Sequence, residues 1–165
     1  MPHPLVDQLR FARSEFRRAL AGVGEEDGAK RLLPMNSLGW IVGHLADQEQ
    51  RYWLERQGRP PAVPGLNALV GYGKPASTPP IGEMRAAWDA VTAATDPFLD
   101  ALDEAALAVV PAGSSGESNG TLLLRVTYHY FYHAGEAQAV RQLLGHPDLP
   151  DFVGDLGGEA PYRGR

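Results

Sequence analysis

The sequence predicts an all-α protein built as a four-helix bundle, and three observations support this fold class. Apolar residues recur at spacings of three and four along four long segments, as they do on the buried face of an amphipathic helix. No segment shows a convincing strand pattern, and the short apolar run at residues 107–110 is too isolated to build a sheet. The chain has 165 residues, of which 44% are hydrophobic, and this is enough for one domain with a substantial core. We therefore expect residues 1–165 to form a single domain.

The first two helices are expected over residues 5–20 and from Asn36 or Ser37 to Gln57. The apolar face of the first helix consists of Leu5, Leu9, Ala12, Phe16 and Leu20. Asn36 and Ser37 are both residue types that cap helix N-termini, and Gly58 is typical of the position just after a helix end.

The third helix is expected over residues 80–102, where Pro97 should kink the helix or split off its last turn. The fourth helix should begin at Asn119 or Thr121, after a stretch rich in glycine and serine, and should end at Gly145. Its central apolar stripe consists of Leu122, Val126, His129, His133, Ala137, Val140 and Leu144.

The longest connection spans residues 59–80 and is rich in proline and glycine. A helix of about 20 residues is roughly 30 Å long, and an extended connection of this size spans that distance easily. The long crossover therefore allows the second and third helices to run parallel, whereas short links force antiparallel neighbours. The tail after His146 lacks periodicity and should wrap the surface.

Composition excludes several function classes. The formal net charge is −5 and the basic residues form no stripe, so nucleic acid is not an expected partner. No apolar run approaches the roughly 18 residues of a membrane span, and the N-terminus lacks the apolar core of a signal peptide, so we expect a cytoplasmic protein without a membrane partner. The chain contains no cysteine, which excludes thiolate ligands and means that any thiol chemistry requires a thiol from outside.

Two histidines replace apolar residues at the centre of the stripe on the fourth helix. His129 and His133 are four residues apart, so both imidazoles point to the same side of the helix, into the interior. A catalytic zinc site usually takes three protein ligands plus water, and His44 near the core face of the second helix is the natural third ligand. His3 and His146 look like surface residues. The alternative is a polar cluster in which the buried histidines bond to Tyr or Glu side chains.

Three polar neighbours are candidates for supporting this site. Asp47 and Gln48 lie one turn beyond His44, where either can orient a ligand imidazole, although a solvated position is the favoured interpretation of Asp47. Glu136 follows His133 by three residues and can act as a base near the site or pair with an arginine. Asp47, Glu136 and Glu49 are also the only candidates for a general acid or base. Arg125 and Arg141 lie off the stripe of the fourth helix and are expected to be exposed.

The pattern of these residues resembles the DinB-like superfamily of damage-inducible helical proteins. The resemblance is carried by His44 in the second helix, by the run His129-x3-His133-x-Gly135-Glu136, and by the segment Gln142-Leu143-Leu144-Gly145, and it covers nearly the whole chain. It implies an up-down-down-up four-helix bundle with a long crossover between helices 2 and 3. It also implies a divalent metal held by His44, His129 and His133. Glu136 departs from the family pattern, in which Gln is more frequent.

Members of this superfamily with an assigned activity include thiol-dependent S-transferases and a maleylpyruvate isomerase. The resemblance therefore implies a metal-dependent enzyme of the thiol S-transferase or detoxification type, with a hydrolase-like reaction as a variant. Zinc or nickel fits the ligand set best, with iron or manganese as alternatives, and a low-molecular-weight thiol and a small-molecule substrate are the expected partners. The rival hypothesis is a non-catalytic, metal-stabilised module for binding or dimerisation in a stress response.

A homodimer is also expected. The fourth helix is apolar or aromatic nearly all round between residues 122 and 132, with surplus residues beyond its core stripe: Leu123, Leu124, Tyr128, Tyr130 and Phe131. A helix that lines a single core should have one polar face, so the surplus favours self-association. The competing explanation is that the tail around residues 152–162 covers these side chains.

Overall fold

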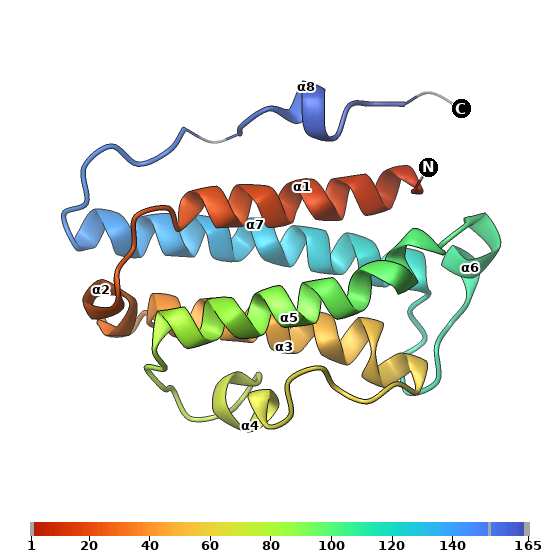
Figure 1. Ribbon diagram of the computed structural model, residues 1–165, viewed down its shortest axis with the longest axis horizontal. Helices are drawn as coiled ribbons and strands as arrows, with labels where there is room; N and C mark the ends of the chain where they lie inside the picture. The colour runs from red at the N-terminus through yellow and green to blue at the C-terminus, as the bar shows by residue number, and fades with distance from the viewer. Residues whose placement is uncertain (1, 152, 164–165) are drawn as a thin grey trace.

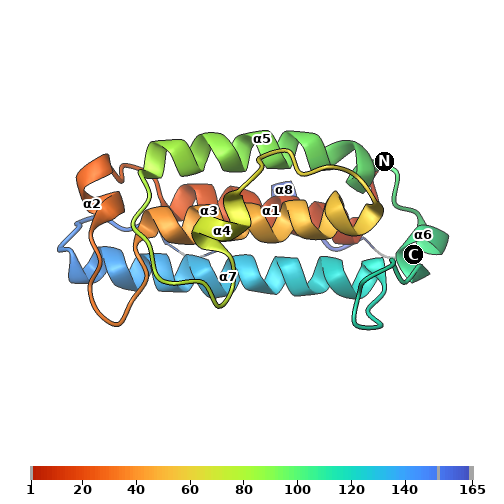
Figure 2. The same ribbon diagram turned by 90° about the horizontal axis from the view of Figure 1, so that it is seen from below.

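The computed structural model describes residues 2–151 and 153–163, and it confirms the all-α prediction. The described residues form eight α-helices and one 3-10 helix and contain no strand. The four longest helices lie side by side (Figures 1 and 2), and they are α1 (Pro4–Ala19), α3 (Leu38–Trp53), α5 (Ile81–Asp100) and α7 (Asn119–Leu143). Helix α3 packs along α5, α1 packs along α7, and α3 also contacts α7. Figure 1 shows α3 and α5 running in one direction and α1 and α7 in the other.

The ends of the long helices follow from local sequence signals. Ser37 caps α3 by accepting a hydrogen bond from the Trp40 backbone N–H, and Ser118 caps α7 in the same way. Helix α3 is shorter than expected, because residues Glu55–Gln57 form the separate 3-10 helix η1 before Gly58 ends the segment with a φ of 72°. Helix α5 continues through Pro97 to Asp100, so the last turn is not split off.

Four short helices occupy the connections and the tail, where the sequence showed no periodicity. These helices are α2 (Glu25–Ala29), α4 (Leu66–Val70), α6 (Glu104–Ala108) and α8 (Leu156–Glu159). The tail runs alongside α1 (Figure 1), where Gln8 donates to the Ala160 carbonyl at 3.0 Å and the Gly154 N–H donates to Glu15. Phe152, one end of the tail segment expected to cover α7, lies outside the described residues. No helix in residues 2–151 and 153–163 is long and apolar enough to cross a membrane.

Helix α3 is buried on almost every side, and two of its glycines make this possible. A Cβ on Gly39 would overlap the carbonyl oxygen of Pro79, and one on Gly43 would lie 2.5 Å from the sulfur of Met84 in α5. Helix α3 is therefore in close contact with its neighbours at Gly43, directly beside His44. This close approach of α5 and of the α4 region brings the residues around His44 into the interior.

A buried polar network links all four long helices. Arg13 donates from Nε to Oε1 of Glu49 at 2.7 Å and also bonds to Oε2 of the same carboxylate. The Tyr130 hydroxyl donates to Glu49 at 2.5 Å, and the Trp88 indole N–H donates to the Tyr130 oxygen at 2.6 Å. Burial raises the pKa of Tyr130 well above its usual value, so the phenol keeps the proton that it donates. Glu49 is fully buried in this network.

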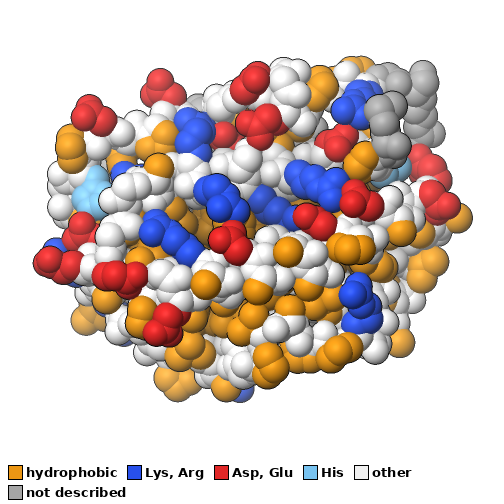
Figure 3. Space-filling model, in the orientation of Figure 1, with side chains coloured by type: hydrophobic (Ala, Val, Ile, Leu, Met, Phe, Trp, Pro, Cys, Tyr) orange, Lys and Arg blue, Asp and Glu red, His pale blue; other side chains and the backbone are white. Residues whose placement is uncertain are grey.

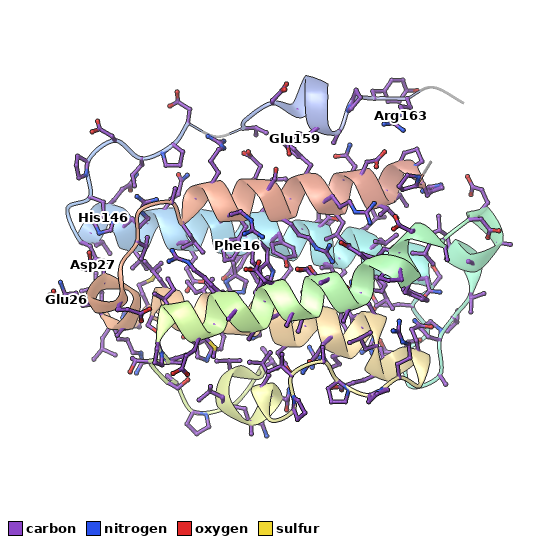
Figure 4. The ribbon with its side chains drawn as sticks, in the orientation of Figure 1. Phe16, Glu26, Asp27, His146, Glu159 and Arg163 are labelled. Carbon is purple, nitrogen blue, oxygen red and sulfur yellow. The ribbon has the colours of Figure 1, made fainter. Side chains whose placement is uncertain are left out.

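The face over α1 and α5 carries alternating charges. Arg10 and Arg17 of α1 pair with Asp100 and Asp89 of α5, and Figure 3 shows basic and acidic side chains gathered along this face. Phe16 points from α1 into the space between the helices (Figure 4), where its ring meets those of Trp88 and Tyr130.

The prediction that Arg141 is exposed is wrong. Its side chain is buried where the end of α7 meets the end of α1, and it donates to the Ala19 carbonyl and to Nδ1 of His146. Because Nδ1 of His146 accepts, its Nε2–H donates to Asp27 at 3.0 Å. Figure 4 shows His146 and Asp27 together at this end of the bundle.

Candidate metal centre

The structure brings the three predicted histidines together between two helices. His44 lies on α3, while His129 and His133 lie one turn apart on α7. The centroid of the His44 ring is 5.2 Å from that of each other ring, and the two rings on α7 are 4.4 Å apart. One nitrogen from each ring lies within 4.8 Å of the other two, so the triad has the spacing of a metal site.

Each imidazole has one nitrogen committed to an acceptor on the outside of the cluster. Nδ1 of His44 lies 2.9 Å from the Val70 carbonyl oxygen. Nδ1 of His129 lies 2.6 Å from Oε1 of Gln48, and Nδ1 of His133 lies 2.7 Å from Oε2 of Glu136. A carbonyl, an amide oxygen and a carboxylate accept hydrogen bonds, so all three Nδ1 atoms carry the proton.

The remaining nitrogens therefore present lone pairs to one another. Nε2 of His133 lies 2.9 Å from Nε2 of His129, and when both rings are neutral with the proton on Nδ1, neither Nε2 has a hydrogen to donate. Three converging lone pairs repel one another unless a cation lies among them. The donor set and its outer partners thus fit a divalent metal bound by neutral imidazoles.

The surroundings of His44 and His129 favour the neutral form of these two rings. Burial and the nearby His133 and His44 lower the pKa of His129 to about 3. Burial is also the main cause that lowers the pKa of His44. Metal ligands must be deprotonated, so the folded chain holds these two rings in the form that binds metal at neutral pH.

Trp40 closes one side of the cluster. Its indole stacks on the His44 ring with centroids 4.5 Å apart and planes 10° apart, and it meets His133 edge-on. This contact fixes the plane of the His44 ring and places a fluorophore directly against the triad.

Two of the predicted supporting residues contact the triad, and one does not. Gln48 and Glu136 hold His129 and His133, as described above, and Asn36 also lies 3.4 Å from Glu136. The interpretation of Asp47 as a solvated residue is wrong, because its side chain is buried and accepts a hydrogen bond from Asn67 of α4 at 3.0 Å. This bond anchors α4 to α3, and the same short helix supplies the Val70 carbonyl.

Sequence patterns gave no indication of the Val70 carbonyl as the outer partner of His44. A backbone atom carries no residue signature, and Val70 lies 26 residues along the chain. Glu49, predicted as a candidate acid or base, points away from the triad into the buried network with Arg13 and Tyr130.

A cavity of about 800 Å³ opens beside the triad. Its walls come mainly from α3 and α7 and include His44, Gln48, Arg51, Tyr52, Tyr72, Glu117, Thr121, Leu124, Arg125, Tyr128, His129 and Tyr132. The volume is typical of a small-molecule site, and two of the three histidines line it. Arg51 was not singled out from the sequence, although its position seven residues after His44 places both on one face of the helix.

Comparisons with known proteins agree with this architecture. The family model described as the DinB superfamily matches residues 8–137, and the chain belongs to this superfamily. A solved structure titled as that of a conserved protein of a locus from Enterococcus faecalis has a similar fold, with a TM-score of 0.68 and 15% identity. That match covers 86% of this chain and 96% of the other. A comparison with curated proteins found no match to the sequence.

Proposed function

We propose that this protein is a metal-dependent enzyme whose divalent metal is held by His44, His129 and His133. The observation that carries the proposal is the arrangement of the three rings, in which every Nδ1 is bound to an outer acceptor and the Nε2 atoms converge. The neighbouring cavity supports an enzyme over a purely structural site, because it leaves room for a substrate beside the ligands. Zinc or nickel suits three neutral imidazoles best, with iron or manganese as alternatives.

The proposed reaction is the transfer of a small thiol to an electrophile. A bound divalent metal supplies Lewis acidity, which lowers the pKa of a thiol and favours the nucleophilic thiolate. The chain has no cysteine, so the thiol enters from solution. The sulfur forms a bond to the electrophilic carbon, the leaving group departs with its electron pair, and the thiol proton passes to solvent. A hydrolase-like reaction would use water in place of the thiol.

The chain's own residues orient the ligands and shape the site. Gln48 and Glu136 fix the rings of His129 and His133 through Nδ1, and α4 fixes His44 through the Val70 carbonyl. A carboxylate partner makes an imidazole a stronger ligand, so Glu136 strengthens His133 in particular. The bond from His133 in turn lowers the pKa of Glu136, which keeps that carboxylate ionised.

A direct test combines metal analysis with an activity screen. The protein is purified without a histidine tag and its metal content is measured, and the loaded protein is then assayed for thiol transfer to electrophiles with and without chelator. We expect activity that disappears with the chelator and returns with the metal. His133→Ala should lose both metal and activity, whereas His146→Ala, which removes a histidine outside the triad, should retain both. Stoichiometric metal without any chelator-sensitive turnover would argue against an enzyme.

The rival function is a non-catalytic, metal-stabilised module for binding or dimerisation in a stress response. One observation favours it: each acid or base candidate is already engaged, Asp47 with Asn67, Glu49 with Arg13 and Tyr130, and Glu136 with His133. This function predicts that metal removal lowers the melting temperature while no substrate is turned over. The enzyme proposal does not need a free acid or base, because the metal itself activates the nucleophile.

We further propose that the long helices form the up-down-down-up bundle of the superfamily and that the protein works in the cytoplasm as a homodimer. The apolar surplus on α7 that suggested dimerisation is smaller than expected, because Leu123 and Tyr130 lie in the core. Leu124, Tyr128 and Tyr132 remain exposed and line the cavity. Light scattering decides the oligomeric state, since a monomer has a mass of 17.8 kDa and a dimer twice that value.

A further inference from the structure

Two arginines line the cavity beside the triad, and they differ in their partners. Arg125 donates from Nε to the Glu117 carboxylate at 2.9 Å and makes a second bond to the same oxygen, so its charge is compensated. Arg51 differs from Arg125, since no acidic side chain among residues 2–151 and 153–163 forms an ion pair with it. Its Nε is buried and lacks any hydrogen-bond partner among the described residues. The cavity therefore contains one uncompensated guanidinium.

The position of Arg51 relates it to the triad. It follows His44 by seven residues, so the two side chains leave the same face of α3 about two turns apart. Arg51 lines the same cavity as His44 and His129, so a ligand in that cavity can contact the guanidinium and the rings together. The guanidinium also lies 5.4 Å from the Tyr52 ring centroid, and this ring supports it from one side.

The charged side chains that line the cavity are two arginines and one glutamate. The chain carries a net charge of −5, yet the cavity combines Arg51, a neutralised Arg125–Glu117 pair and neutral histidines that would hold a divalent cation. A half-buried guanidinium without a partner gains most from a carboxylate, which accepts two parallel hydrogen bonds from it.

Several other side chains of the cavity wall are apolar or aromatic, and they favour a ligand with apolar surface. Leu124, Tyr128 and Tyr132 project from α7, and Tyr72 comes from the segment after α4. Aromatic side chains offer a large apolar contact area, and their rings pack against other rings or aliphatic chains. A ligand that contacts both the Arg51 guanidinium and this aromatic wall has an apolar body and a negatively charged end.

We propose that Arg51 binds the carboxylate of a small, partly apolar substrate whose reactive end faces the histidine triad. The placement of the reactive end rests on the proposed metal-dependent function, whereas the carboxylate site on Arg51 does not. The substrate class is thus an aryl- or alkyl-substituted carboxylic acid carrying the electrophile.

The experiment compares two probes of the same shape, 4-phenylbutyrate and its uncharged amide. Binding of each probe is measured by calorimetry on the metal-free and the Ni²⁺-loaded protein, at low ionic strength because salt weakens such pairs. We expect the carboxylate to bind about two- to fivefold more tightly than the amide in both forms, as is typical of a partly exposed charge pair. Arg51→Met should reduce this ratio to about one, whereas Arg125→Met, a matched arginine in the same cavity, should retain it.

Other outcomes overturn the proposal in distinguishable ways. Equal binding of the two probes, or no binding of either at millimolar concentration, would refute the carboxylate site. A carboxylate preference that is absent from the metal-free protein, appears only with Ni²⁺ and survives Arg51→Met would mean that the metal holds the carboxylate. That result would reject the role of Arg51 while supporting the metal proposal. If the chain binds no metal, the metal-free titrations still decide the role of Arg51.

A second measurement on the unaltered protein covers the case in which Arg51→Met does not fold. Phenylglyoxal modifies accessible arginines, and peptide masses report the rate at each position. Phenylbutyrate should protect Arg51 severalfold while the amide does not, and Arg125 should be unaffected by either probe. Equal modification of Arg51 with and without phenylbutyrate would contradict the proposal.

Discussion

The buried pair of Arg13 and Glu49 offers the sharpest test of how the four long helices are held together. Arg13 is 7% exposed and Glu49 is fully buried. In the variant Arg13→Met, Glu49 keeps a single donor, the Tyr130 hydroxyl, for a carboxylate that the folded state excludes from water. Removing one member of a buried ion pair typically costs about 3–5 kcal/mol, because the other charge is left buried and uncompensated.

Urea denaturation followed by circular dichroism measures this loss. For a chain of this length, about 3–5 kcal/mol corresponds to a fall in melting temperature of roughly 6–20 °C. The control is Arg17→Met, which removes an arginine from the same helix that pairs with an exposed Asp89. Its effect should stay within about 1 kcal/mol.

The double variant Arg13→Met/Glu49→Leu separates charge from packing. Replacing both partners with apolar side chains removes the stranded carboxylate, so the double variant should recover most of the stability that Arg13→Met loses. A residual loss of about 1–2 kcal/mol is expected, because the Tyr130 hydroxyl then lacks an acceptor. The reasoning fails if Arg13→Met is as mild as Arg17→Met, or if the double variant is no better than the single one.

The remaining predictions concern helix packing and pH. Gly135→Ala should stabilise the protein by about 0.5–1 kcal/mol, because alanine favours a helix and nothing lies within 4 Å of the added Cβ. Gly39→Ala should destabilise it by about 1–3 kcal/mol, because the backbone of Pro79 must move. Equal effects of the two variants in thermal melts would contradict the close packing of α3. The folded-state pKa values of His44 and His129 lie below 6.5, so the unfolded chain binds more protons and the metal-free protein should lose stability as the pH falls from 6.5 to 4.5. The free energy of unfolding should change by at most about 1.4 kcal/mol per pH unit for each proton taken up. Urea titrations that show equal stability at pH 6.5 and 4.5 would contradict the claim that these two rings are buried and neutral.

The triad and the long helices could be predicted because, in a helix, the spacing of two residues in the sequence determines whether their side chains leave the same face. His129 and His133 are four residues apart on a helix, so they must share a face wherever the helix lies. The environment of Asp47 could not be predicted in this way. The short helix α4 covers it, and α4 has too few residues to show a period of its own.

Tyr130 and Arg141 of α7 are more buried than its apolar stripe predicts, because each lies at a contact with another helix. The amphipathic pattern assumes that a helix buries a single stripe, but α7 packs against both α1 and α3. Tyr130 therefore lies in the core beside Glu49 although it falls outside the predicted stripe. Arg141 is buried because the ends of α1 and α7 meet there, a tertiary contact that leaves no trace in the spacing of α7 itself.

The most direct test of the central claim is X-ray absorption spectroscopy of the untagged protein loaded with zinc, together with its metal stoichiometry. The account predicts one metal per chain, with three imidazole nitrogens at about 2.0–2.1 Å. It also predicts that His133→Ala loses stoichiometric binding while circular dichroism shows an intact helical fold, because bundle packing buries far more apolar surface than one imidazole. Binding below one equivalent, or a coordination sphere without three imidazoles, would contradict the assignment of His44, His129 and His133 as a shared metal site.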